Sequence, residues 1–180
     1  MRIIAGRYKG RRLQVPPGDV RPAMDRMRVS LFGILGDLEG TSFLDLFSGS
    51  GAVGIEAASR GASPVYLVER NVKARETLLR NSAFVETEVV LRLFPAELFL
   101  RRCDRRFTTV YLDPPFRYPD KPALLALAEP VVEPEGLLII HAPKEDPMPD
   151  AFGSLVLVDR RAYGRSILSF YGLPPAAAAP

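Results

Sequence analysis

Four consecutive residues, Asp113-Pro114-Pro115-Phe116, could bind an exocyclic amino group (this segment is called the Asp-Pro-Pro-Phe motif below). The prolines fix the backbone and offer no N–H group, so the Asp113 carboxylate and the Pro114 carbonyl face a ligand as two hydrogen-bond acceptors. Two acceptors draw an aromatic amine towards tetrahedral geometry and make its lone pair available for attack. Phe116 offers a ring on which a splayed base can stack. The motif therefore predicts transfer of a group, such as a methyl held on a sulfonium, to an amino nitrogen by positioning, with Asp113 able to take the released proton.

A second segment could bind a nucleotide-like cofactor. Gly49-Ser50-Gly51-Ala52-Val53-Gly54, the glycine turn, follows an apolar run and precedes a helical pattern. Such turns bring backbone N–H groups and a helix N-terminus close to a ligand. Glu69 lies 20 residues after Gly49, the spacing at which a carboxylate binds ribose in dinucleotide-binding folds. Taken alone, this segment predicts a nucleotide and leaves open which one.

The elements between these segments predict a parallel sheet. Apolar runs indicate strands at 43–47, 65–69, 89–94, 108–112 and 137–141, and helical spacing indicates helices at 53–60, 72–82, 96–102 and 121–129. This alternation is typical of a doubly wound α/β fold with right-handed crossovers. Ligands of such sheets bind beyond the carboxyl ends of the strands, where Asp45, Glu69 and Asp113 are expected. In the helix at 72–82, Ala74, Leu78 and Leu79 are expected to face inward.

The two ends of the chain differ from this alternation. Residues 2–15 predict two short strands that turn near Lys9-Gly10, followed by a helix from Met24. Near the other end, strands at 154–160 and 167–171 should pair antiparallel, because the link between them is too short for a crossover helix.

The domain organisation expected from these patterns has three parts. They are an N-terminal extension at residues 1–40, an α/β domain at 41–173, and a disordered Pro/Ala-rich tail at 174–180.

The composition excludes several classes of protein. The 180 residues contain 47% apolar side chains but no apolar run long enough for a membrane span or a signal peptide, so a cytoplasmic protein is expected. The single cysteine, Cys103, cannot form an internal disulfide and has no evident base partner, so we expect a passive thiol and no metal site.

The charge is unevenly distributed. Residues 1–30 carry eight basic and two acidic side chains, whereas the rest of the chain carries 16 basic and 19 acidic ones. A basic segment on a slightly acidic body suggests a polyanionic partner, most simply nucleic acid; a merely solubilising edge is the alternative. The candidate RNA contacts are Arg2, Arg7, Lys9, Arg11, Arg12, Arg21, Arg26 and Arg28, with Arg117 and Tyr118 after the Asp-Pro-Pro-Phe motif.

Together these segments resemble the RsmD-type family of bacterial 16S rRNA (guanine-N2)-methyltransferases, which use S-adenosylmethionine. The similarity covers nearly all of residues 1–171. It is carried by segments 2–10, 21–22, 25–28, 31–32, 44–51, 54–57, 113–116 and 163–164.

The resemblance implies a Rossmann-like class I methyltransferase, with a seven-stranded, mostly parallel sheet and a C-terminal antiparallel hairpin. It further implies that Asp45 and the glycine turn hold the methionine part of the cofactor and Glu69 its ribose, while Asp113 to Phe116 hold the guanine amino group. The basic extension would bind rRNA phosphates, in a particle where ribosomal proteins complete the surface. Apart from the resemblance, we expect a monomer. The residues expected at the cofactor are Asp45, Phe47, Ser48, Gly49, Ser50, Gly51, Gly54, Glu69, Arg70, Pro95 and Ala96.

The chain departs from the family pattern at a few positions. Ala23 and Val29 replace a usual Thr and Glu, which puts a hydrogen-bonded lid over the cofactor in doubt. After the third strand, Phe94-Pro95-Ala96 stands where an acidic residue often binds adenine, so apolar and backbone contacts are expected there. His141 follows the fifth strand, and a solvated or hydrogen-bonded histidine is expected in preference to a catalytic base.

Three alternatives remain at this stage. A dinucleotide-dependent oxidoreductase would explain the glycine turn and Glu69 but would leave the Asp-Pro-Pro-Phe motif unused. A non-catalytic RNA-binding protein would not need both motifs intact. Adenine-N6 or protein-glutamine methylation would use the same amino-group chemistry, and only the basic extension and the resemblance favour guanine.

Overall fold

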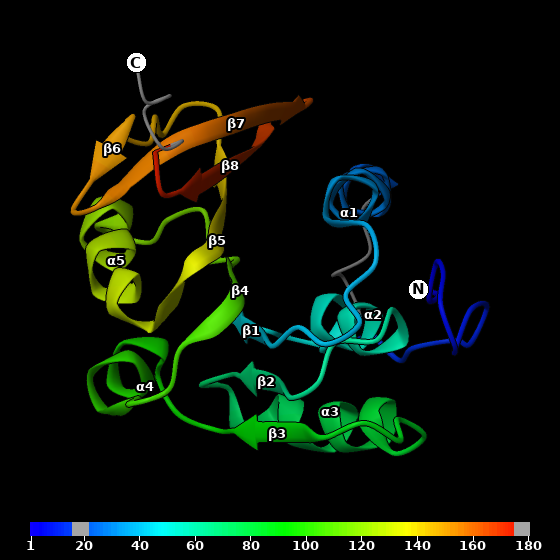
Figure 1. Ribbon diagram of the computed structural model, residues 1–180. Helices are drawn as coiled ribbons and strands as arrows, with labels where there is room; N and C mark the ends of the chain where they lie inside the picture. The colour runs from blue at the N-terminus through cyan, green and yellow to red at the C-terminus, as the bar shows by residue number, and fades with distance from the viewer. Residues whose placement is uncertain (16–21, 175–180) are drawn as a thin grey trace.

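The computed structural model describes residues 1–15 and 22–174, and Figure 1 shows the arrangement of its elements. The α-helices are α1 (Pro22–Leu35), α2 (Ala52–Ser59), α3 (Arg75–Ser82), α4 (Ala96–Arg102) and α5 (Lys121–Ala128). The strands are β1 (Phe43–Leu46), β2 (Val65–Val68), β3 (Val89–Arg92), β4 (Phe107–Leu112), β5 (Val132–Pro143), β6 (Ala151–Phe152), β7 (Leu155–Tyr163) and β8 (Ser166–Gly172). Two short 3₁₀ turns, η1 (Val72–Ala74) and η2 (Glu129–Val131), precede α3 and β5. No helix in the described ranges is both long and apolar enough to span a bilayer.

The strands form one sheet in the order β3-β2-β1-β4-β5-β8-β7-β6. The first five strands pair in parallel, and β8 enters antiparallel between β5 and β7. The reversal of direction from β1–β2–β3 to β1–β4–β5 makes β1 and β4 neighbours at the point where open α/β sheets bind ligands.

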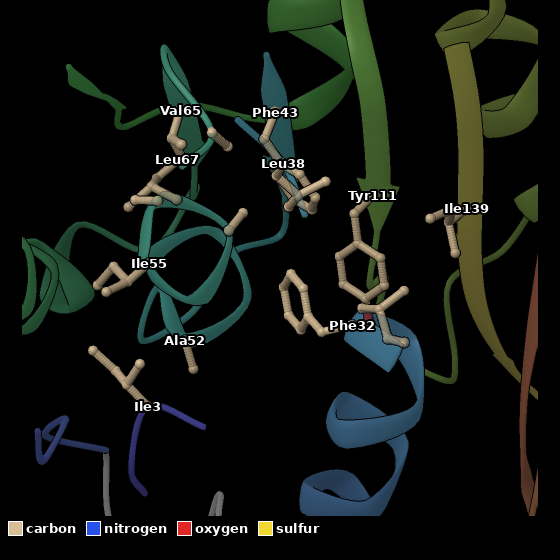
Figure 2. Packing of buried hydrophobic residues seen from close by; sticks show 14 of the residues in the cluster. Ile3, Phe32, Leu38, Phe43, Ala52, Ile55, Val65, Leu67, Tyr111 and Ile139 are labelled. Carbon is tan, nitrogen blue, oxygen red and sulfur yellow. The ribbon is translucent and has the colours of Figure 1, made fainter. Parts of the chain in front are cut away.

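Helices cover both faces of the sheet. Alternate residues of each strand point to opposite faces, so in β1 Phe43 packs into one buried cluster and Leu44 into the other. Helices α1, α2 and α3 cover the first face, and α4 and α5 cover the second (Figure 1). Figure 2 shows the first cluster, in which Phe32 of α1 lies beside Tyr111 of β4.

The fold class predicted from the sequence is confirmed, including the final antiparallel pair. The sheet has one strand more than expected, because the two-residue β6 adds to the edge of β7. The prediction for Leu79 is wrong: this residue is 47% exposed, because Leu78 and Asn81 occupy the buried side of this short helix, with Ala74 buried just before it.

The N-terminal hairpin prediction is right in direction but wrong in extent. Residues 1–15, called the arm below, pair through a single antiparallel bridge between Arg2 and Arg12, and residues 5–10 form a broad turn in place of two strands. The arm buries Ile3, Tyr8 and Leu13 in the same cluster as α1, α2 and α3. It is therefore part of the same packed unit. The tail predicted to be disordered falls, from residue 175 on, outside the described residues.

Candidate active site

Three carboxylates lie at or near the carboxyl ends of three adjacent strands of the sheet. Asp45 stands in β1, Glu69 follows β2, and Asp113 follows β4, and both β2 and β4 pair with β1. The amide of Asp113 donates to the Leu46 carbonyl at 3.2 Å, which extends the β1–β4 pairing to the motif itself. The sheet thus brings together residues that are up to 68 positions apart in the sequence, as predicted.

The glycine turn is held by two of these carboxylates. Asp45 Oδ2 accepts from the amide of Gly54 at 2.9 Å, and Glu69 Oε2 accepts from the amide of Gly49 at 2.9 Å. A Cβ on Gly54 would lie 2.2 Å from the Leu67 side chain, so glycine is required for α2 to approach β2. Gly49 has φ +53 and nothing within 4 Å of the place its Cβ would take, which leaves open space beside the turn.

The electrostatics of this edge favour a cation. Asp45 is 1% exposed, and burial raises its pKa well above the ordinary range, with further contributions from the negative charges of Asp113 and Glu69. The hydrogen bond from Gly54 opposes this rise only in part. Because three carboxylates repel one another here, a ligand that carries positive charge would be stabilised.

Other residues of the glycine turn are fixed by backbone contacts. The Ser48 amide and hydroxyl donate to the Val68 carbonyl at 3.0 and 3.3 Å, and the Gly51 amide donates to the Ser48 carbonyl at 2.7 Å. Phe47 has a positive φ of 63°, an uncommon conformation for a residue with a side chain. Such conformations persist where the surroundings hold them, often at binding sites.

Asp113 forms a close contact with the only histidine in the chain. Its Oδ1 lies 2.7 Å from His141 Nδ1, and the two side chains are 24% and 3% exposed. Of the two expectations for His141, the hydrogen-bonded side chain is the one that the structure confirms. The side chain is buried and not solvated. Phe116 is 39% exposed and available for stacking, and its ring meets the His141 ring edge-on with centroids 5.4 Å apart.

The buried side chain of Lys121 fixes the loop after the motif, and the sequence did not point to this residue. Lys121 is 1% exposed, and its Nζ donates to the carbonyls of Phe116 at 2.9 Å and Tyr118 at 3.3 Å. An ion pair with Asp146 at 2.5 Å satisfies its charge. Lysines are almost never fully buried without a partner. No pattern around Lys121 in the sequence identifies Asp146 as that partner.

Tyr118 connects the loop after the motif to α4. Its ring packs edge-on against Phe47 at 5.6 Å, and its hydroxyl donates to Glu97 at the start of α4. Burial and that contact raise the pKa of Tyr118. The exposed Arg70 is close enough to oppose this rise. The side chain expected to contact RNA is therefore engaged within the protein.

The segment expected to hold adenine begins α4. Pro95 is exposed, Ala96 is 4% exposed, and Phe94 packs against Phe99 with centroids 6.2 Å apart. The next residue, Glu97, supplies an acidic side chain in the first turn of α4, one position after the segment 94–96 where an acidic residue was expected to be absent.

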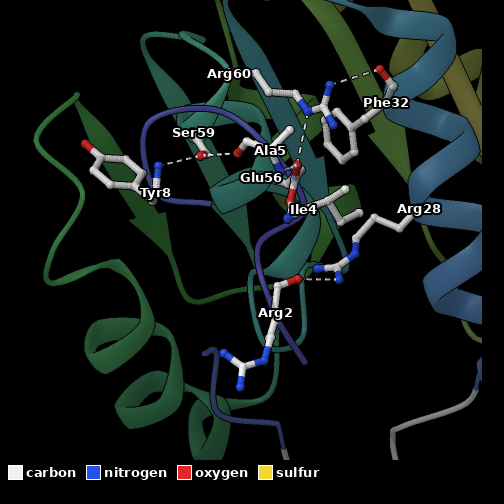
Figure 3. A network of polar contacts seen from close by, with 9 residues as sticks. All are labelled: Arg2, Ile4, Ala5, Tyr8, Arg28, Phe32, Glu56, Ser59 and Arg60. Atoms are coloured by element: carbon white, nitrogen blue, oxygen red, sulfur yellow. Dashed lines mark hydrogen bonds and ion pairs between the residues drawn. The ribbon is translucent and has the colours of Figure 1, made fainter. Parts of the chain in front are cut away.

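Two polar residues of α2 anchor the arm (Figure 3). The buried Glu56 accepts from the amides of Ile4 at 2.7 Å and Ala5 at 3.0 Å. Ser59 Oγ accepts from the Tyr8 amide at 2.9 Å and donates to the Ala5 carbonyl at 2.6 Å. Both anchors were missed, although a Glu and a Ser three positions apart in an otherwise apolar helix are a usable signal.

The cationic side chains of the N-terminal region fall into two groups. Those exposed to solvent are Arg2, Arg7, Lys9, Arg11, Arg12 and Arg26, and Arg117 beyond the motif is exposed as well. Arg28 differs from the expectation: it is 4% exposed and donates to the Arg2 carbonyl at 2.7 Å, so it links α1 to the backbone of the arm (Figure 3). Arg21 lies outside the described residues.

One buried side chain links the arm to the glycine turn. Asn81 of α3 is 3% exposed, and its Nδ2 donates to the Gln14 carbonyl at 2.9 Å and the Ser50 carbonyl at 2.8 Å. Its Oδ1 accepts from the Gln14 amide at 2.8 Å. No local pattern identifies Asn81, because its partners lie 67 and 31 positions away in the sequence.

No group of three or more histidine, cysteine, aspartate or glutamate side chains in residues 1–15 and 22–174 could hold a metal ion. Cys103 is a free thiol of intermediate exposure, and burial raises its pKa above the ordinary value, as expected of an unreactive thiol.

Known proteins resemble this chain over most of its length. The family model described as "Conserved hypothetical protein 95" matches residues 1–172. "Putative rRNA methyltransferase YlbH" of Bacillus subtilis is 33% identical over 180 residues, covering 95% of this chain and 98% of that protein. "Ribosomal RNA small subunit methyltransferase D" of Escherichia coli K12 is 38% identical over 121 residues, covering 65% of this chain and 61% of that protein.

The fold has a close counterpart among solved structures. "Putative methyltransferase yhhF from Escherichia coli" superposes with a TM-score of 0.85 at 30% identity, covering 96% of this chain and 97% of that one. The family match and these similarities agree with the segments that carry the resemblance in the sequence. The chain therefore belongs to the RsmD-type methyltransferase family.

Proposed function

We propose that the protein transfers a methyl group from S-adenosylmethionine to the exocyclic N2 amino group of a guanine in 16S rRNA. It is an S-adenosylmethionine-dependent rRNA methyltransferase, in keeping with its family and with relatives named for small-subunit rRNA methylation. The observation that carries the proposal is the Asp-Pro-Pro-Phe motif at the end of β4, directly beside the glycine turn on β1.

The chemistry of the carboxyl edge fits this cofactor. Glu69 is held by the amides of Gly49 and Asn71, at 2.9 and 2.8 Å, with its carboxylate at the strand end where ribose hydroxyls would be bound. Asp45 and the open side of Gly49 would face the methionine part, whose ammonium and sulfonium charges complement the three carboxylates. Arg70, Phe47, Pro95 and Ala96 would line the remaining side. When bound, the cofactor supplies an electrophilic methyl group.

The motif would prepare the acceptor. Asp113 and the Pro114 carbonyl would accept the two hydrogens of the amino group, and the exposed Phe116 ring would stack on the base. As the nitrogen gains the methyl group, it loses a proton, which Asp113 is placed to accept. The residues act by position and charge, which is sufficient for large rate effects when the reacting atoms are aligned.

The arm would bind the rRNA backbone. Two of its cations, Arg2 and Arg12, line a groove of about 530 Å³ between the arm and α1, together with the buried Arg28. Phosphate contacts by exposed lysines and arginines give affinity without sequence specificity, so the arm would position the RNA while the motif selects the base. We infer that residues 1–40 serve as the RNA-binding extension of the catalytic domain at 41–173. The substrate would be a small-subunit particle in the cytoplasm, met by the enzyme as a monomer.

Two alternatives are weighed against this proposal. Adenine-N6 methylation would use the same motif, and only the family and the basic arm favour guanine. An oxidoreductase would need a dinucleotide, and it receives no support from relatives that are named as methyltransferases.

The experiment uses small-subunit particles from cells that lack the corresponding methyltransferase. They are incubated with the protein and methyl-labelled S-adenosylmethionine, and the modified base is mapped by mass spectrometry. Label on guanine N2 of 16S rRNA is expected. Label on adenine, or label on ribosomal protein and none on the rRNA, would overturn the substrate assignment.

A further inference from the structure

His141 and Asp113 occupy equivalent places on neighbouring strands. The pairing of β4 with β5 ends at Leu112 opposite Ile140, so the next residue on each strand is Asp113 and His141. Their side chains meet at 2.7 Å between Nδ1 and Oδ1. His141 also pairs with Leu168 of β8, which fixes its backbone from the other side.

The surroundings of the imidazole decide where its proton lies. His141 Nε2 is buried and has no hydrogen-bond partner among residues 1–15 and 22–174. A proton on Nε2 would be a buried donor without an acceptor, which costs more than an unused lone pair on a weak acceptor. The neutral ring with its proton on Nδ1 is therefore favoured, and that proton is donated to Asp113. This assignment follows from the hydrogen-bond network.

The contact with His141 uses one of the two carboxylate oxygens of Asp113. Oδ1 accepts from His141, whereas Oδ2 has no partner among the side-chain hydrogen bonds of the described residues. The same imidazole packs edge-on against Phe116, with an angle of 74° between the ring planes. One buried ring thus contacts both ends of the Asp-Pro-Pro-Phe motif, while the prolines between them provide no N–H group to fix it.

We propose that His141 is a positioning residue for methyl transfer, which orients Asp113 by donating from Nδ1 and leaves Oδ2 to accept from the amino group. The proposal rests on the proposed function. The lone pair of the amino nitrogen forms the new N–C bond, the electrons of the broken C–S bond remain on sulfur, and the released proton goes to Asp113 Oδ2. His141 keeps its own proton throughout and does not act as a base.

The tautomer can be measured without any assay of activity. Because His141 is the only histidine, ¹⁵N-labelling of histidine gives one pair of ring signals, which report the protonation of each nitrogen. We expect the Nδ1–H tautomer in the native protein and a shift of these signals in Asp113→Ala. An Nε2–H tautomer, or signals that do not respond to Asp113→Ala, would overturn the proposal.

The role in catalysis is tested by two substitutions at the same position. His141→Leu removes the donor, whereas His141→Asn retains an N–H group that can reach Asp113. With labelled cofactor and unmethylated particles, we expect His141→Leu to lower kcat by about 10²-fold, with KM for the particle and cofactor affinity nearly unchanged. His141→Asn should restore most of that loss, because an amide can orient the carboxylate.

Each remaining outcome decides the question. Parental kcat in His141→Leu would refute positioning, and loss of rate in both variants would indicate that the imidazole itself transfers the proton. If His141→Leu does not fold, the rate of His141→Asn still separates the two roles. If the native protein does not methylate particles at all, the proposed function fails, while the NMR result still tests the contact.

Discussion

The carboxyl edge of the sheet and the arm achieve binding in different ways. At the edge, the important side chains are buried or half-buried, and each of Asp45, Glu69 and Asp113 has at least one oxygen fixed by a specific partner. In the arm, the backbone is fixed by Glu56 and Ser59, while most cationic side chains extend into solvent. The edge thus depends on the position of single atoms, and the arm depends on summed charge. Single substitutions should therefore be severe at the edge and mild in the arm.

The largest effect is expected from Asp113→Ala. This change removes an acceptor for the amino group and leaves the His141 donor without a partner, so we expect methyl transfer to fall by about 10³-fold or more. Cofactor affinity should fall far less than the rate, because only one of the three negative charges is lost while the glycine turn and Glu69 are untouched. Single-turnover rates and calorimetric titration measure the two quantities. Asp104→Ala, at an exposed acid away from the edge, is the control. Near-parental activity in Asp113→Ala would refute the mechanism.

In the arm, a comparable loss should require several changes at once. Arg7→Glu, Lys9→Glu and Arg11→Glu together should weaken RNA binding by about 10²-fold at low salt and flatten the dependence of log affinity on log salt by about two units. Each change alone should be mild, since Arg7 already pairs with Glu86 and Arg11 already lies over Phe84.

The matched control applies the same charge change elsewhere. Arg101, Arg102 and Arg106 are exposed near the end of α4, and their replacement by Glu should leave the salt slope nearly unchanged. Equal slopes for the two triple variants would mean that net charge alone acts, and the arm would then serve only solubility.

The same contrast explains which parts of the structure the sequence could predict. The strands, the glycine turn and the placement of Asp45, Glu69 and Asp113 at one edge follow from local patterns and from the rule for parallel sheets. These features are encoded in neighbouring residues, and the fold confirms them.

Features that depend on contacts between distant segments could not be predicted. The pairing of Asp113 with His141 requires the register of β4 with β5, which no local pattern specifies. The alternation of apolar and charged residues in the arm predicted a hairpin, but the amides of Ile4, Ala5 and Tyr8 find their partners on α2. Because side chains of α2 accept hydrogen bonds from these amides, this part of the arm does not need a neighbouring strand to pair its backbone.

Asn81 joins the two regions, so its substitution should affect both. Asn81→Leu leaves the Gln14 and Ser50 groups without their partner, and we expect the free energy of unfolding to fall by roughly 2 kcal/mol. Affinity for both RNA and cofactor should fall, unlike in the arm variants, where only RNA affinity changes. Urea denaturation and the two titrations measure these effects. Asn81→Asp keeps the acceptor for the Gln14 amide but turns a second, acceptor-only oxygen towards the Gln14 and Ser50 carbonyls, so it should destabilise at least as much. Loss of one affinity alone would show that the regions are not linked through Asn81.

The smallest effect concerns the free energy of unfolding that is lost because Asp45 carries an ionisable group in a buried position. Its pKa is raised in the folded protein above the ordinary value of about 3.9, so the folded state holds this proton more tightly than the unfolded chain does. The stability associated with Asp45 is therefore present at low pH and is lost as the pH rises from the ordinary value through the raised one. Asp45→Asn cannot ionise and keeps an oxygen that can accept from the Gly54 amide.

We accordingly expect Asp45→Asn to match the parent in stability near roughly pH 4 and to exceed it increasingly towards neutral pH, measured by denaturant unfolding across this range. Asp104→Asn, at an exposed acid, should show no such trend. Cofactor affinity should fall in Asp45→Asn, because one of the three charges that attract the cation is lost. A carboxylate that lowers the stability of the free protein and strengthens ligand binding is what distinguishes the edge from the arm. Unchanged stability at neutral pH would show that Asp45 is tolerated without cost and would remove that distinction.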